Sequence, residues 1–108
     1  MTQHSIGLFN DLPLESGTKV EIRDETIAVF RIDDAVYAIN DLCSHAEASL
    51  SEGEVFGVNV ECPRHGAEFD VTTGAVRSLP ATRSVATYAT EIRNGEVFIT
   101  IESEATDE

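Results

Sequence analysis

The chain has 108 residues, close to the modal size of one domain, and its 42% hydrophobic content is enough for a core, so we expect a single domain over residues 1–108. Twenty acidic against seven basic residues give a formal net charge of −13. A surface of this sign repels nucleic acid and anionic membranes and favours a partner with a basic patch.

The chain carries no apolar run near the roughly 18 residues that span a bilayer. Its first residues also lack the basic and apolar regions of a signal peptide. We therefore expect a cytoplasmic protein, in which the two cysteines stay reduced and are available to bind a metal.

The first half of the chain is rich in short β-type runs. Residues 18–22 alternate, with Val20 and Ile22 on one face, and residues 26–32 and 35–39 flank Asp33-Asp34. Two β-rich runs joined by a two-residue acidic turn are typical of an antiparallel hairpin.

Residues 40–80 follow a different pattern, in which very short apolar runs are separated by glycines. No segment here keeps a 3.6-residue apolar period, and residues 46–50 could form one helical turn at most. We expect an irregular insert that forms a smaller subdomain over about residues 40–80.

Residues 87–93 and 96–101 are predicted to form a second hairpin around Asn94-Gly95, because this dipeptide accepts the positive φ angles of a type I′ turn. Residues 102–108 are acidic and lack large apolar side chains, so we expect a frayed tail. The fold class is therefore all-β, with an antiparallel β-sandwich base built from both chain ends.

The insert contains Cys43-Ser44-His45, then sixteen residues, then Cys62-Pro63-Arg64-His65. Four of the five cysteines and histidines of the chain fall in these two motifs, and only His4, expected to be a solvated terminal residue, lies outside them. Two thiolates and two imidazoles in two short loops form a set of metal ligands.

Three explanations of these motifs compete. The residues could be unrelated, or they could hold a structural zinc ion, which readily takes two Cys and two His. Zinc fingers, however, usually pair Cys with Cys and His with His at short spacing. Loops that each supply one Cys and one His fit best the third explanation, a Rieske-type [2Fe–2S] cluster with both Cys on one iron and both His on the other.

The double motif resembles the Rieske ferredoxin family. The second loop and its continuation, Cys62-Pro63-Arg64-His65-Gly66-Ala67-Glu68-Phe69-Asp70 and residues 71–74, match the family closely, and Leu79-Pro80-Ala81 falls where the family has a proline loop over the cluster. The resemblance implies the Rieske fold, with one [2Fe–2S] cluster per chain held by Cys43, His45, Cys62 and His65.

The chain departs from the Rieske proteins of membrane complexes, which carry an extra cysteine in each cluster loop and Ser and Tyr hydroxyls that bond to sulfur. Here Ala46 and Arg64 stand at or near the cysteine positions, and Ala67 and Phe69 stand where the hydroxyls would be. The chain therefore resembles the soluble, lower-potential ferredoxin branch.

The resemblance implies one-electron transfer from a flavin-dependent ferredoxin reductase to a terminal oxygenase. We do not expect an enzyme, because His4 alone cannot build the two-histidine iron site of an oxygenase and the chain has no Gly-rich dinucleotide fingerprint. Two alternatives stay open: a Rieske ferredoxin that serves iron–sulfur assembly or another redox system, and a zinc-stabilised interaction module.

Overall fold

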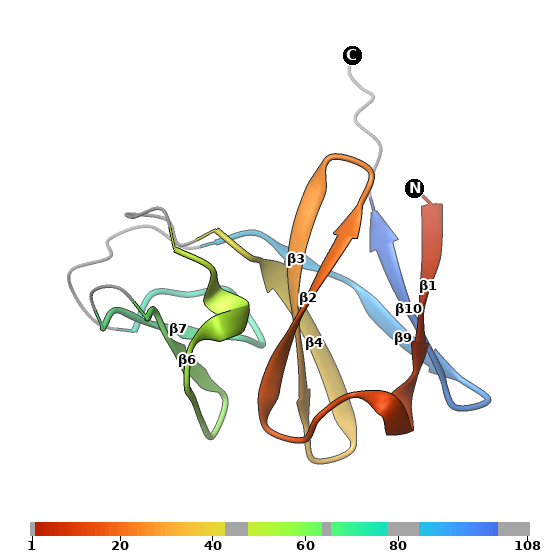
Figure 1. The fold of residues 1–108 in the computed structure, drawn as a ribbon, viewed down its shortest axis with the longest axis horizontal. Coiled ribbons are helices and arrows are strands. Elements are labelled where there is room, and N and C mark those ends of the chain that lie inside the picture. The colour runs from red at the N-terminus through yellow and green to blue at the C-terminus, as the bar shows by residue number, and fades with distance from the viewer. Residues whose placement is uncertain (1, 43–47, 64–65, 78–84, 102–108) are drawn as a thin grey trace.

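The computed structural model describes residues 2–42, 48–63, 66–77 and 85–101. These residues form short strands arranged in three antiparallel sheets, together with two turns of 3-10 helix (Figure 1). The all-β class predicted from the sequence is confirmed.

The sheets follow one another as three layers (Figure 1). The first has the order β1 (Thr2–Leu8), β10 (Glu96–Ile101), β9 (Thr90–Arg93). The second has the order β2 (Ser16–Ile22), β3 (Glu25–Ile32), β4 (Ala35–Asn40), β8 (Thr87–Tyr88). The third has the order β5 (Val55–Phe56), β6 (Asn59–Glu61), β7 (Glu68–Asp70), and the helical turns are η1 (Phe9–Asp11) and η2 (Leu50–Glu52).

Strand β3 lies between two cores, which explains its nearly continuous apolar sequence. Ile27 and Val29 share one core with the inward face of β10, whereas Ala28 and Phe30 share the other with the third sheet. Successive side chains of a strand point to opposite faces, so a strand covered on both sides has no polar alternation. The first two sheets thus form the predicted sandwich base, and the third sheet is attached to its other face.

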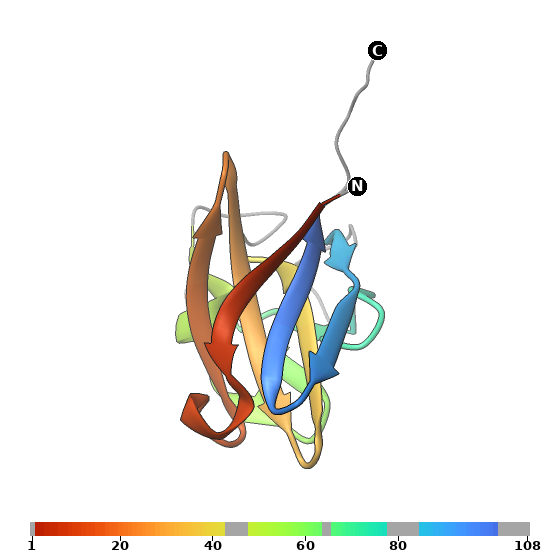
Figure 2. The ribbon, with the colours of Figure 1, turned by 90° about the vertical axis from the view of Figure 1, so that its right-hand side faces the viewer.

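Both predicted hairpins are present. β3 pairs with β4 across Asp33, whose φ is +55°, and β9 pairs with β10 across Asn94 and Gly95, with φ of +53° and +80°. Asp and Asn tolerate this left-handed region better than most residues, so the local sequence determines both turns. Figure 2 shows β10 between β1 and β9, so the two ends of the chain share one sheet.

The prediction of one strand over residues 87–93 is wrong, because the chain changes sheets at Ala89. Tyr88 pairs with Ala38 of the second sheet, and its hydroxyl donates to Glu25 at 2.7 Å. The Ala89 carbonyl instead accepts the N–H of Thr100 from the first sheet. The segment therefore closes one side of the sandwich as two short strands.

Two smaller expectations need correction. His4 is not a solvated terminal residue, since it is half-buried in β1 and its Nε2 lies 2.9 Å from the Thr2 hydroxyl. The insert expected to be irregular contains a small sheet, although its strands have only two or three residues.

The tail predicted for residues 102–108 lies outside the described residues. Within the part of the chain that the structure describes, no helix is long and apolar enough to cross a membrane.

Candidate metal centre

Of the four predicted ligands, Cys62 lies in the described part of the chain, whereas Cys43, His45 and His65 lie outside it. Cys62 directly follows β6 and is only 1% exposed. Its thiol is free, and it packs in the same core as Phe30 of β3. The base of the fold therefore holds this ligand candidate at a fixed, dry position.

The turn that follows Cys62 reverses the chain into β7. The Cys62 N–H donates to the Ala67 carbonyl at 2.6 Å, and the Gly66 N–H donates to the Cys62 carbonyl at 3.0 Å. Gly66 has a φ of +79°, a conformation that glycine adopts without strain. The tight turn predicted at Gly66 is confirmed, and it places the Cys62 thiol at the end of the third sheet.

The segment that contains Cys43 and His45 begins and ends at neighbouring points of the fold. Leu42 and Ser49 form an isolated antiparallel bridge, and the Leu50 N–H donates to the Asp41 carbonyl at 2.7 Å. The carboxylate of Asp41, which is buried, also accepts hydrogen bonds from this region. Sequence reasoning did not single out Asp41, because an aspartate that follows a strand is usually solvated.

A second buried carboxylate, Asp70, stands at the base of the segment with the predicted proline loop. It accepts the N–H and the hydroxyl of Thr72, at 2.8 and 2.5 Å, and pairs with Arg77 at 2.9 Å. Burial raises the pKa of Asp70, but the hydrogen bonds from Thr72, followed by the Arg77 guanidinium, hold that pKa below its usual value. Arg77 is also fixed by its N–H, which donates to the Glu68 carbonyl. Arg77, the last described residue before the predicted proline loop, is thus held beside β7.

The bases of these three segments share one hydrophobic core. From these bases, the core includes Leu50, Cys62, Ala67 and Val85, and Ala48 packs against it. A buried free thiol in the core that the bases of the two Cys-and-His segments share fits a group held jointly by both. Among the described residues alone, no three potential ligands gather, since three of the four candidates lie elsewhere in the chain.

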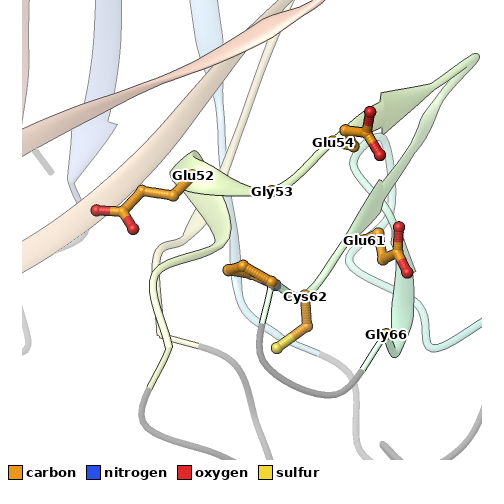
Figure 3. Close-up of a pocket in the computed structure, with 7 residues that line it drawn as sticks. Glu52, Gly53, Glu54, Glu61, Cys62 and Gly66 are labelled. Carbon is orange, nitrogen blue, oxygen red and sulfur yellow. The ribbon is translucent and has the colours of Figure 1, made fainter.

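A pocket of about 270 Å³ adjoins Cys62, and three glutamates are among the residues that line it. Its residues are Glu52, Gly53, Glu54, Glu61, Cys62, Pro63 and Gly66 (Figure 3). In Figure 3 the carboxylates of Glu54 and Glu61 lie on one side of the pocket, and the Cys62 sulfur points away from them. Negative charges near a redox centre would oppose the addition of an electron and lower the reduction potential of that centre.

Comparisons with known proteins agree with this geometry. The family model described as "Rieske [2Fe-2S] domain" matches residues 3–89. The 3-phenylpropionate/cinnamic acid dioxygenase ferredoxin subunit of Photorhabdus laumondii is 38% identical over 96% of this chain and 99% of that protein. The solved ferredoxin of carbazole 1,9a-dioxygenase from Nocardioides aromaticivorans has a TM-score of 0.91 at 33% identity, covering 94% of this chain and 100% of that one.

A chain from the solved complex of reduced oxygenase and oxidized ferredoxin in carbazole 1,9a-dioxygenase has a TM-score of 0.86 at 35% identity, over 90% of this chain and 100% of that one. These matches extend over nearly the whole protein, and the relatives are named as ferredoxins and not as catalytic subunits. The cofactor is accordingly a Rieske-type [2Fe–2S] cluster, and the zinc alternative is not supported. The chain belongs to the Rieske [2Fe–2S] domain family, in which it is an electron-transfer ferredoxin.

Proposed function

We propose that this ferredoxin takes one electron from a flavin-dependent reductase and delivers it to a terminal oxygenase. The observation that carries this proposal is the full-length match to a ferredoxin that was solved together with its oxygenase. The relatives described above belong to dioxygenase systems with different substrates, so the match supports the kind of partner and leaves the substrate open. None of them is named for iron–sulfur assembly, and that alternative is less well supported.

We assign the cluster to Cys43 and Cys62 on one iron and His45 and His65 on the other. The buried free thiol of Cys62 and the shared core below the two loops support this assignment. With two thiolates and two neutral imidazoles, the bound group accepts a single electron more readily than a four-thiolate cluster, which carries more negative charge in both states.

The chain's own residues tune and direct this exchange. Ala67 and Phe69 are fully buried in the core that contains Cys62, and neither can donate a hydrogen bond from its side chain. Together with the carboxylates of the acidic pocket, this favours a potential at the low end of the Rieske range. The net charge of −13 would steer the protein toward a basic surface on its partner. A cytoplasmic location is part of the proposal.

The ligand assignment is tested with a matched pair of histidine variants. His65→Ala removes a proposed ligand, whereas His4→Ala removes the histidine outside the two motifs. Both proteins are purified without air, and iron, acid-labile sulfide and the EPR spectrum after dithionite are measured. We expect His4→Ala to keep the Rieske signal and His65→Ala to lose it; retention of the wild-type signal by His65→Ala would refute the assignment.

The partner is tested by mixing the dithionite-reduced ferredoxin, freed of excess reductant, with an oxidised Rieske terminal oxygenase and following the absorbance by stopped flow. We expect fast reoxidation that slows as salt is added, because screening weakens attraction between opposite charges. In the control, an unrelated acidic protein replaces the oxygenase. Reoxidation of the ferredoxin by the oxygenase that is no faster than in this control would contradict an oxygenase partner.

A further inference from the structure

The carboxylate of Asp41 is almost fully buried, at 4% exposure, and both of its oxygens are used. Oδ1 accepts the Ser51 N–H at 2.8 Å, and Oδ2 accepts the hydroxyl of Ser49. The backbone of Asp41 is fixed as well, since its N–H donates to Thr26 at 3.0 Å and its carbonyl accepts the Leu50 N–H. Asp41 is therefore bonded at once to β3 and to the returning end of the first ligand loop.

The two buried aspartates have different partners. Asp70 has the guanidinium of Arg77 at 2.9 Å, whereas Asp41 is bonded to a hydroxyl and an N–H and forms no ion pair within the described residues. Burial of a carboxylate among neutral partners is costly. The backbone bond from Leu50 to Asp41 already brings the loop ends together, and the carboxylate adds two further bonds, to Ser49 and Ser51.

The outgoing end of the loop is held by polar contacts, and the returning end is held by polar contacts in addition to the apolar packing of Ala48 and Leu50. The side chain of Leu42, at the outgoing end, is 56% exposed, and its N–H donates to the Asn40 Oδ1 at 2.9 Å. Ser49, at the returning end, is held by Asp41. Two consecutive side chains, Asn40 and Asp41, thus bond to Leu42 and Ser49, which stand on the two sides of the first ligand loop.

We propose that Asp41 is a positioning residue for the cluster: through the Ser49 hydroxyl and the Ser51 N–H it fixes the described returning end of the first ligand loop, and with it the position from which Cys43 and His45 bind. This inference rests on the proposed ligand assignment. The loop between Leu42 and Ser49 is short, so a shift of its returning end displaces both ligands. Groups outside the ligand shell that orient the ligands tune the metal centre, and here the spectrum and the potential of the cluster would report the shift.

Serine variants separate positioning from charge, because they leave the Asp41 carboxylate in place. Ser49→Ala removes the hydroxyl that donates to Asp41, and Ser49→Thr retains a hydroxyl there. Ser51→Ala is the matched control, since Ser51 bonds to Asp41 through its backbone N–H, and its hydroxyl contacts Ser49 at 3.1 Å. Asp41→Asn tests the carboxylate directly.

The measurements are iron and sulfide per chain, the g-values of the reduced protein, the midpoint potential and the thermal unfolding midpoint. We expect shifted g-values and a shifted potential in Ser49→Ala and Asp41→Asn, wild-type values in Ser51→Ala, and recovery in Ser49→Thr. The proposal is overturned if Ser49→Ala changes the unfolding midpoint alone, or if Ser51→Ala shifts the potential as far as Ser49→Ala does.

Should Asp41→Asn fail to fold, the three serine variants decide the question. The wild-type protein separates this inference from the ligand assignment. If wild type shows a Rieske spectrum that His65→Ala abolishes, and Ser49→Ala leaves that spectrum unchanged, only the role of Asp41 fails. If His65→Ala keeps the wild-type spectrum, the ligand assignment fails first.

Discussion

Gly74 offers a quantitative test of the structure, because an alanine there meets two separate obstacles. Its φ is +76°, and a Cβ would lie 2.2 Å from the Val85 carbonyl oxygen and 3.1 Å from the Thr87 side chain. Val85 cannot turn away, since its N–H is bonded to the Gly74 carbonyl at 2.9 Å. Gly57 is the matched control, because its φ is +62° and nothing would lie within 4 Å of its Cβ.

The two costs can be separated. Left-handed backbone costs a residue with a Cβ roughly 1–2 kcal/mol, and this is the whole cost expected for Gly57→Ala. Forcing atoms into a packed site adds about 1–3 kcal/mol, so Gly74→Ala should lose about 2–5 kcal/mol. At about 4–8 °C per kcal/mol for a domain of this size, the unfolding midpoint should fall by roughly 4–16 °C for Gly57→Ala and about twice as far for Gly74→Ala.

Both variants are compared with wild type as anaerobic, cluster-loaded proteins, heated at one scan rate and followed by far-UV circular dichroism. Equal midpoints for the two variants would show that the close contact between Gly74 and Val85 does not exist. A Gly74→Ala protein within 2 °C of wild type would also contradict the left-handed turn at this position.

Three further predictions concern ionisable side chains. The pKa of Asp70 is lowered, so the stability that its carboxylate contributes is present above the unfolded value near 3.8 and is lost as pH falls through the folded value. The urea concentration at the unfolding midpoint should therefore fall less between pH 6 and pH 3 in Asp70→Asn than in wild type. Burial, and then the hydrogen bond to Glu25, raise the pKa of Tyr88 from 10.0 to about 12. The free energy of unfolding should therefore fall by about 1–2 kcal/mol, after allowance for solvent screening, as pH rises from 10 to 12. Tyr88→Phe should remove this fall in urea unfolding, and a fall that persists in the variant would contradict the prediction. The Arg31 guanidinium donates to the Leu12 carbonyl at 3.1 Å and lies 4.2 Å from the centre of the Phe9 ring. Arg31→Met should therefore lower the free energy of unfolding by about 1–3 kcal/mol and leave the EPR spectrum unchanged. A changed spectrum would show that the sandwich base is coupled to the cluster.

The sequence predicts those parts of the fold that local chemistry determines. Asn94-Gly95 and Asp33 specify their turns wherever the strands lie, and both hairpins are found. Strand β1 carries no comparable signal, because its residues alternate only weakly and its partner β10 lies at the other end of the chain. The break at Ala89 likewise depends on which sheet each neighbour joins.

In the candidate site, too, the sequence predicts some residues and not others. Residue type and spacing predict Cys62 and its three companions as ligands, since few groups bind metal as thiolate and imidazole do, and of the four the structure describes Cys62. The burial of Asp41 could not be predicted, because an aspartate after a strand is usually solvated and its partners Ser49 and Ser51 come together only in the folded chain.

The pairing of both chain ends in one sheet has a consequence for synthesis on the ribosome. Thr2 lies opposite Ile101, so the β1–β10–β9 sheet cannot close until almost the whole chain has emerged, and the apolar face that carries Ile27 and Val29 stays uncovered until then. Among the described residues, the core around Cys62, by contrast, includes none beyond Val85. The order of the elements along the chain therefore lets the nascent protein assemble the core that contains Cys62 before the β1–β10–β9 sheet exists.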